Sequence, residues 1–474
     1  MNHGILKSHK IMTNSLKYIY KIILVMLILS MHTAQAKELL DFTLHKLDSG
    51  LPGNTLLVMG GIQGDEPGGF NAASLLVTHY KIQKGSLWVV PNLNFISIIK
   101  RSRGIYGDMN RKFAKVSKHD PEFESVKKIK SIIMNKQVDM ILNLHDGSGF
   151  YCPNYIDNMH NPDRWGQSII IDQGRIESKS FGDLGGVADN VAANINKHLL
   201  HKKHAFHVMN TRTSSGNIEM SKTLTYFAIR NLKPALGIEA SKSFLTHKRT
   251  YYHLLALEAF MKILGIEFKR TFILSTGEVQ NAIDKNVKLA FFDNKIMLDV
   301  GNARRNLSYM PFKKDSQIEF VPSNPLLTVL GGGVGNSFRV YHGNRRLTHI
   351  HPEYFEYDST IKAVTMQIDG NEKLVNFGEM VDVERSFMVI SPQGFRVNVI
   401  GYKKTGVRNE ADITIEKNDI IQNFSVDTTG KLYRVEIYRE EKFAGMILIN
   451  FGPSTRQTSS SGRLPSANSF AHSK

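Results

Sequence analysis

A short polar stretch, Gln63-Gly-Asp-Glu66, lies between an apolar run and the start of a helical pattern. The run Thr55–Met59 is typical of a buried strand and leads into the Gly60-Gly61 pair. Pro67, a favoured first-turn residue, opens the helical pattern. A strand, a glycine turn and a helix start place side chains at the carboxyl edge of a sheet, where α/β proteins build their sites. The two oxygen donors could bind one ion there or simply cap the helix.

Two later strands also end in groups with useful chemistry. Val138–His145 ends in His145, and Ala235–Glu239 is a short apolar strand that ends in Glu239. Between Glu66 and His145 the chain carries Arg103 and then Asp108-Met-Asn-Arg111. By themselves, Glu239 could form a surface ion pair and the arginines could be solvated.

Taken in order, these residues resemble the zinc carboxypeptidase family M14, from about Thr55 to Ser241. The resemblance implies one zinc ion, held by Glu66, His145 and the residue at position 63. It implies Glu239 as the general base and proton donor to the leaving amine. It also implies that Arg103 stabilises the oxyanion, and that Asn110 and Arg111 hold the terminal carboxylate of the substrate.

Gln63 departs from the family pattern, which has a histidine at this ligand position. A narrower group resembles this chain more closely, namely the periplasmic D,L-carboxypeptidases with glutamine there, which trim peptidoglycan tripeptides in helical bacteria. A neutral amide oxygen is a poorer donor than imidazole but leaves the charge of the site unchanged. We therefore expect weaker zinc binding with retained activity, against the alternatives of a dead site or another divalent ion.

Two further residues are candidate substrate contacts. Trp165 lies in a polar loop, where it could contact the substrate at the rim or pack over the loop base. Thr225-Tyr226 lies just before the Glu239 strand, in the region where M14 enzymes carry a substrate-covering tyrosine. The register of that segment stays open, and Thr225 is taken as the candidate.

The first 36 residues have the features of a signal peptide. Four lysines precede the apolar run Ile22–Met31, and Ala34-Gln-Ala36 follows as a small-residue cleavage site. We expect export to the periplasm; an uncleaved anchor is the alternative, and Met12 could be the true start. The single cysteine, Cys152, cannot form an internal disulfide, and we expect a structural thiol rather than a nucleophile.

The charge of the chain is strongly positive but diffuse. The formal net charge is +17, and four of the positive charges lie within the first 36 residues. Neither a basic stripe interleaved with aromatics nor a nucleic-acid reading motif accompanies this charge, which argues against a nucleic-acid partner. A diffuse positive surface suits an anionic polymer such as the cell wall, and equally plain solubility.

The patterning predicts an α/β domain over 37–268, followed by two small all-β domains and a tail. Helical patterns start near Pro121 and Asp189, and a third covers Tyr252–Leu264. Short strand-like runs with turn residues follow, which predicts a small β domain over 269–352. Regular strand spacing predicts an immunoglobulin-like sandwich over 353–452. The Ser-rich segment 453–474 is expected to be disordered.

Two motifs of the carboxyl-terminal half resemble ligand-binding patterns. Gly331–Gly335 lacks the lysine and hydroxyl residue of a phosphate-binding loop and is expected to be a turn. His349 and His351 have the spacing that puts both rings on one face of a strand. Without a carboxylate or thiol partner nearby, metal binding there is not expected.

The resemblance implies a periplasmic enzyme that removes meso-diaminopimelate from tripeptide stems, leaves dipeptides and so controls helical cell shape. The β domains could bind other cell-wall proteins. Two alternatives remain: a zinc deacylase of N-acyl amino acids on the same fold, and a noncatalytic peptidoglycan-binding scaffold that has lost its metal.

Overall fold

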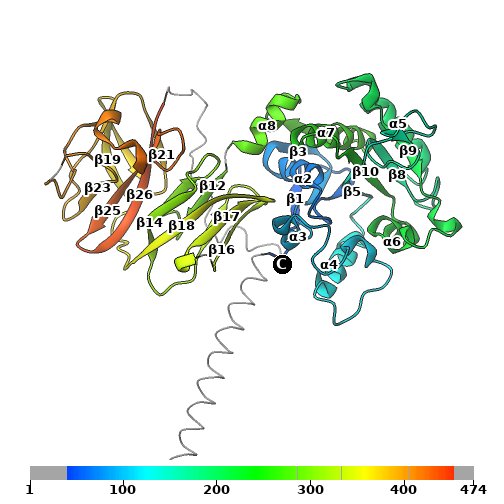
Figure 1. Cartoon of the computed structure of the whole chain (residues 1–474), viewed down its shortest axis with the longest axis horizontal. Helices are drawn as coiled ribbons and strands as arrows, with labels where there is room; N and C mark the ends of the chain where they lie inside the picture. The colour runs from blue at the N-terminus through cyan, green and yellow to red at the C-terminus, as the bar shows by residue number, and fades with distance from the viewer. Residues whose placement is uncertain (1–39, 286, 333, 405, 453–474) are drawn as a thin grey trace, which may run out of the picture. The chain divides into compact units, whose positions relative to one another are not determined.

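The computed structural model describes residues 40–285, 287–332, 334–404 and 406–452, and those from Phe42 onward belong to one compact unit. The expected signal peptide and the Ser-rich tail lie outside these residues. The described chain has an α/β domain followed by modules made of strands (Figure 1). Over these ranges, the structure contains no helix with the length and apolar character needed to span a membrane.

A seven-stranded sheet forms the middle layer of the α/β domain. Its strands are, in spatial order, β1 (His45–Asp48), β4 (Ser86–Val90), β2 (Thr55–Met59), β5 (Met140–Gly147), β10 (Ala235–Ser241), β8 (Ser168–Ile171) and β9 (His207–Asn210). The four consecutive strands β4, β2, β5 and β10 run parallel to one another. The carboxyl ends of β2, β5 and β10 therefore meet at one edge of the sheet.

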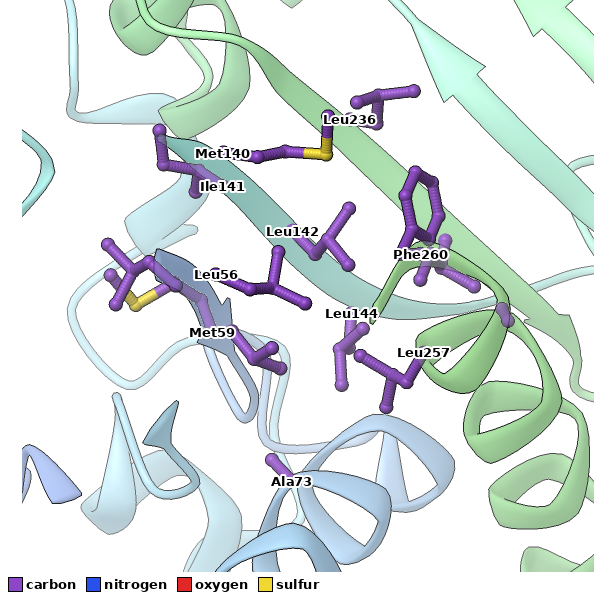
Figure 2. Packing of buried hydrophobic residues seen from close by; sticks show 14 of the residues in the cluster. Leu56, Met59, Ala73, Met140, Ile141, Leu142, Leu144, Leu236, Leu257 and Phe260 are labelled. Atoms are coloured by element: carbon purple, nitrogen blue, oxygen red, sulfur yellow. The ribbon is translucent and has the colours of Figure 1, made fainter. Parts of the chain in front are cut away.

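Helices cover both faces of this sheet. The elements are α2 (Pro67–His79), α5 (Leu184–Ile195) and α7 (Thr246–Ile263) on one face, and α4 (Phe123–Ile133) and α6 (Leu224–Arg230) on the other (Figure 1). Figure 2 shows Leu142 and Leu144 of β5 packed against Leu257 and Phe260 of α7. Burial of each such side chain contributes about 1.5–3 kcal/mol to the free energy of unfolding, so the packed core holds the strand ends in place.

The remaining elements of this domain are short. The helix α3 (Phe95–Lys100) follows β4, and β3 (Tyr80–Lys84) pairs with β11 (Glu267–Arg270) outside the main sheet. The one-turn helix η1 (Met109–Arg111) carries two of the candidate substrate residues.

The carboxyl-terminal half is built from strands, which confirms the expected fold class. Two sheets form the middle module: β13 (Ile296–Asp299), β12 (Lys288–Phe291) and β15 (Phe320–Pro322), then β14 (Asn306–Lys313), β18 (Arg345–Phe355), β17 (Phe338–His342) and β16 (Leu327–Leu330). Two four-stranded sheets form the sandwich of the last module: β20 (Asn371–Asn376), β19 (Ala363–Ile368), β22 (Ser386–Val389) and β24 (Ile415–Glu416), then β21 (Met380–Val383), β26 (Lys442–Phe451), β25 (Leu432–Arg439) and β23 (Arg396–Val399).

Both internal boundaries differ from the expected ones. The helix α8 (Thr276–Asp284) follows the predicted boundary at 268, and its Val279 and Ile283 are buried in the core of the α/β domain. Its nine residues give too short a pattern for the helix to stand out in the sequence. The boundary at 352 falls inside β18, because that strand continues to Phe355.

The glycine-rich segment and the histidine pair of this half lie in a connection between strands and on a strand, respectively. Gly331, Gly332 and Gly335 lie in the connection between β16 and β17, as a turn would. His349 and His351 lie on β18 with ring centroids 6.4 Å apart. In the described part of the chain, no group of three or more His, Cys, Asp or Glu side chains is arranged to hold a metal.

Candidate active site

Three side chains from two strand ends bring donor atoms to one point. His145 lies near the carboxyl end of the fully buried strand β5, and Gln63 and Glu66 lie in the loop between β2 and α2. His145 Nδ1 lies 2.9 Å from Glu66 Oε2 and 3.2 Å from Gln63 Oε1. All three residues are buried, although they are polar. The expected ligand set therefore converges in space.

The donor set fits a divalent metal ion. Donors around a tetrahedral zinc with bonds of about 2.0–2.1 Å lie roughly 3.3 Å apart, close to the spacings here. Imidazole nitrogen, carboxylate oxygen and amide oxygen are all possible ligands for such an ion. The site has three candidate metal ligands only if the amide oxygen of Gln63 is one of them, because His145 and Glu66 supply the other two.

Asp108 orients the Gln63 amide. The Nε2 group of Gln63 donates to both carboxylate oxygens of Asp108, each at 2.9 Å. The amide oxygen of Gln63 is thereby turned toward His145. Burial alone would raise the pKa of Asp108, but the hydrogen bond from Gln63 and the Arg103 cation outweigh burial and lower it. Asp108 is thus a carboxylate that fixes the weakest donor of the set.

Glu239 lies directly beside His145, because the parallel pairing of β10 with β5 puts the two residues in register. Its Oε2 atom is buried without a hydrogen-bond partner among the described residues. Burial raises the pKa of Glu239 to about 8, with His145 opposing that rise and Glu66 adding to it. A buried carboxylate with a free oxygen, next to a candidate metal site, has the position of a general base.

The predicted substrate residues line the same cavity, which has a volume of about 360 Å³. Arg103 donates to Asp108 at 2.9 Å, its Nη1 lies 3.8 Å from Glu66, and its side chain is half exposed. The Asn110 side chain contacts His145 Nε2 at 3.4 Å. Arg111, Trp165 and Thr225 also line the cavity. All the predicted site residues therefore lie together.

Other residues considered from the sequence lie elsewhere. Tyr226 follows Thr225 on α6 but is not among the residues that line the cavity. Arg101 donates to the backbone oxygen of Asn344 in the middle module. Cys152 does not line the cavity either, so no thiol of the described residues lies at this site.

Lys242 lines the cavity and was not predicted. Its Nζ lies 3.3 Å from Glu66 Oε1 and 3.2 Å from Asp65 Oδ2. These carboxylates outweigh the effect of burial and raise the pKa of Lys242, so it stays a cation. The available signal was its position three residues after Glu239, directly after the last residue of the same strand.

Comparisons with known proteins agree with this geometry. Residues 17–284 match the family described as the catalytic part of a carboxypeptidase controlling helical cell shape, and residues 357–452 match the C-terminal domain of metallo-carboxypeptidases. The apo structure of the cell shape determinant protein Csd4 from Helicobacter pylori is 38% identical, with a TM-score of 0.77, and the match covers 87% of this chain and all of that one. A tripeptide-bound structure of Csd4 gives the same values.

A third structure, the mDAP-bound form of Csd4, described as a D,L-carboxypeptidase, is 39% identical over 84% of this chain and 97% of that one, with a TM-score of 0.76. Among curated proteins, no match was found. The fold and site define a metallocarboxypeptidase. The chain belongs to the family of carboxypeptidases that control helical cell shape.

Proposed function

We propose that this protein is a periplasmic zinc D,L-carboxypeptidase that removes meso-diaminopimelate from peptidoglycan tripeptide stems and leaves dipeptides. The observation that carries the proposal is the convergence of Gln63, Glu66 and His145 beside Glu239, in a cavity that also holds all five substrate-binding candidates. Its similarity to Csd4, which has been solved with a tripeptide and with mDAP, supports this choice of substrate.

Gln63, Glu66 and His145 would hold the zinc ion, which would supply Lewis acidity toward the scissile carbonyl and the attacking water. A cation held beside Glu239 would favour its ionised form, against the effect of burial. The Glu239 carboxylate takes a proton from that water and later delivers it to the leaving amine.

Three cavity residues position the substrate. Arg103 is half exposed at the cavity, where its guanidinium stabilises the developing oxyanion. Asn110 and Arg111 hold the terminal carboxylate, Arg111 through its planar fork. A fixed anchor for the chain end sets the distance from that end to the scissile bond. This arrangement gives an exopeptidase that removes one residue.

Export to the periplasm is part of the proposal, on the basis of the basic, apolar and small-residue segments within the first 36 residues. At that location the enzyme meets its substrate, and trimming the stems there alters which strands can be cross-linked. Control of helical cell shape follows from this trimming.

The test uses the chain from Lys37 onward, supplied with zinc, and disaccharide-tripeptide muropeptides. Released diaminopimelate is measured by chromatography, with Glu239→Gln and a chelator as controls. We expect release that is lost in both controls. Absence of release from zinc-loaded protein would refute the proposal and point to another acyl substrate, such as an N-acyl amino acid. Failure to bind zinc as well would indicate a noncatalytic wall-binding protein.

A further inference from the structure

A second cavity, of about 590 Å³, lies between the middle module and the last module, outside the active site. Strands β14 and β18 line one side, and β23 and β25 line the other. The two sides are tied together, because Arg434 of β25 donates to the backbone oxygens of Ser308 and Tyr309 in β14. The cavity is therefore a defined part of the fold.

The wall from the last module is a polar face of a sheet. Arg434, Glu436 and Tyr438 alternate along β25 and so point to one side, whereas Val435 and Ile437 face the core of the sandwich. The register of β23 adds a second row, with Arg396 opposite Tyr438 and Asn398 opposite Glu436. Ordinary surface strands carry such residues toward water, but here the row on β25 is buried.

Two charged groups in this array have hydrogen-bonding atoms without a partner among the described residues. Glu436 is 2% exposed; its Oε2 accepts from Tyr438, but its Oε1 has no hydrogen-bond partner among the described residues, and the nearest cation, Arg434 Nη1, lies 3.4 Å away. The Arg396 guanidinium stacks on Tyr438, with its central carbon 4.8 Å from the ring centroid. It makes no hydrogen bond to any residue that the structure describes. Arg396 is half-buried, and its charge also acts on the carboxylates of Glu436 and Glu410. The cavity thus offers a buried acceptor and a cation without hydrogen-bond partners, which together suit a ligand that has both kinds of group.

Exposed aromatic rings stand at the same cavity. Tyr309 is 73% exposed and Phe424 is 50% exposed, and both line the cavity. Tyr309 has φ of +54°, a conformation that a bulky side chain rarely adopts, at a bulge where the pairing of β14 shifts between Leu307 and Met310. Such bulges re-aim side chains, and strain of this kind is found at binding sites.

The charges and aromatic rings of this cavity favour some classes of ligand over others. A simple anion would meet the carboxylates of Glu436 and Glu353, and a simple cation would meet three arginines. An extended peptide usually adds to the edge of a sheet, whereas the polar groups here lie on its face. A sugar ring has an apolar face that packs on aromatic rings, and hydroxyls that both donate and accept. Arg396 stacks on Tyr438 and keeps its hydrogen-bond donors available, so it suits one carboxylate on that sugar.

We propose that this cavity binds a saccharide that carries one carboxylate. The ring packs on Tyr309 and Phe424, hydroxyls bond to Glu436 and Asn398, and the carboxylate pairs with Arg396. The choice of an amino-sugar glycan as the natural source rests on the proposed function, because the stems that the enzyme trims are joined to such a glycan as amides of its lactyl carboxylates. The unit bound in this cavity is one whose stem has been removed, on a strand whose other units still carry stems. The β modules thereby hold the polymer while the α/β domain cuts its peptides.

The experiment measures binding by saturation-transfer NMR and by titration calorimetry with zinc-loaded protein from Lys37 onward. The probe is the disaccharide of N-acetylglucosamine and N-acetylmuramic acid with a free lactyl carboxylate, and neutral di-N-acetylchitobiose is the comparison. We expect the acidic disaccharide to bind more tightly than chitobiose. Arg396→Ala should weaken the acidic disaccharide at least about tenfold, because a charge-assisted pair is lost.

Two further variants serve as a second test and as a control. Tyr309→Asn removes the ring but keeps a residue that tolerates positive φ, so it tests the aromatic contact without a folding defect. Arg408→Ala, at an exposed arginine of the last module outside the cavity, is the matched control and should bind normally. The proposal is overturned if the unaltered protein does not bind the acidic disaccharide. It is also overturned if the Arg396 and Tyr309 variants bind it as tightly as the unaltered protein does. Competition by free stem tripeptide at this cavity would overturn the proposal as well, in favour of a peptide ligand.

The two proposals fail separately. Arg396→Ala should release diaminopimelate from soluble tripeptide stems at the normal rate, and more slowly from intact sacculi. Normal release without disaccharide binding would refute the saccharide site alone. Normal disaccharide binding without any release would refute the carboxypeptidase proposal alone.

Discussion

At the residue scale, the Gln63 amide depends on Asp108. A glutamine side chain can turn either its oxygen or its nitrogen toward a ligand, and only the oxygen can bind a cation. Asp108 decides between them by accepting two hydrogen bonds from the Gln63 nitrogen. A glutamine at this position thus remains compatible with a metal site because a carboxylate lies behind it.

We predict that Asp108→Asn weakens metal binding by about 10–100-fold, the usual effect of removing a group that orients a ligand. Zinc affinity is measured by competition with a chromogenic chelator. Asp65→Asn is the control, since Asp65 contacts Lys242 rather than a donor of the set. Equal zinc affinities for the two variants would show that Asp108 does not orient Gln63.

His342 in β17 makes stability depend on pH. Burial, and then the Arg345 cation, lower its pKa to about 3, although Asp284 opposes the shift. The folded state therefore keeps the His342 ring neutral at pH values below 6.5, the ordinary pKa of histidine. The contribution of the neutral His342 ring to folding stability is fully present above pH 6.5 and is lost progressively as the pH falls toward 3.

We predict that acidification from pH 7 to pH 5 costs about 2 kcal/mol through His342, from roughly 1.4 kcal/mol for each pH unit below 6.5. His342→Gln should remove this part of the pH dependence. Urea unfolding followed by circular dichroism at both pH values gives the comparison. The same acid-induced loss in both proteins would exclude His342 as the cause.

At the scale of elements, Asp146 joins three pieces of the α/β domain. It follows His145 in β5 and accepts from the backbone nitrogen of Gly68 at 2.8 Å, at the start of α2. It also pairs with Arg249 at 3.2 Å and His253 at 3.1 Å, both in α7. The strand that carries His145 is thereby tied to the two helices that cover it.

We predict that Asp146→Ala destabilises the α/β domain by about 3–5 kcal/mol, because it leaves the fully buried His253 and the half-buried Arg249 without their carboxylate partner. Tryptophan fluorescence reports on this domain alone, since Trp88 and Trp165 are the only tryptophans of the chain. Glu124→Ala, which removes an exposed ion pair with Lys127, should leave the urea midpoint unchanged. A similarly small shift for Asp146→Ala would contradict the proposed tie.

At the scale of the whole molecule, the two β modules share a hydrophobic core. The cluster built around Phe291, Phe312 and Val340 of the middle module includes Phe443, Met446 and other residues of the last one. Neither module buries this cluster alone. The two modules should therefore fold as one unit, and the second cavity lies within that unit.

We predict that a chain shortened to end at Glu356 keeps a folded α/β domain but loses the middle module. Hydrogen exchange should show fast exchange in β14 and β18, and slow exchange in β2 and β5 as in the full chain. Hydrolysis of soluble tripeptides should persist, because the proposed catalytic residues all precede position 240. Slow exchange in β14 and β18 of the short chain would show that the middle module folds independently.

Local patterns were enough to predict much of this protein. Buried runs marked β2, β5 and β10, and parallel strands share a carboxyl edge, so the sequence alone predicted that Gln63, His145 and Glu239 lie close together. The fold class and the family followed from the order of such segments. Each segment is a pattern of a few neighbouring residues, and the family follows from the order of the segments between about Thr55 and Ser241.

Only the tertiary structure revealed Asp108 behind Gln63, Lys242 beside Glu66, α8 in the first core, and the saccharide cavity between modules. These depend on strand register and on packing between segments far apart in sequence, which no local pattern encodes. Arg396 and Glu436 look like ordinary strand residues in the sequence. The pairing of β23 with β25, and the placement of β14 across from them, turn those residues into a binding site.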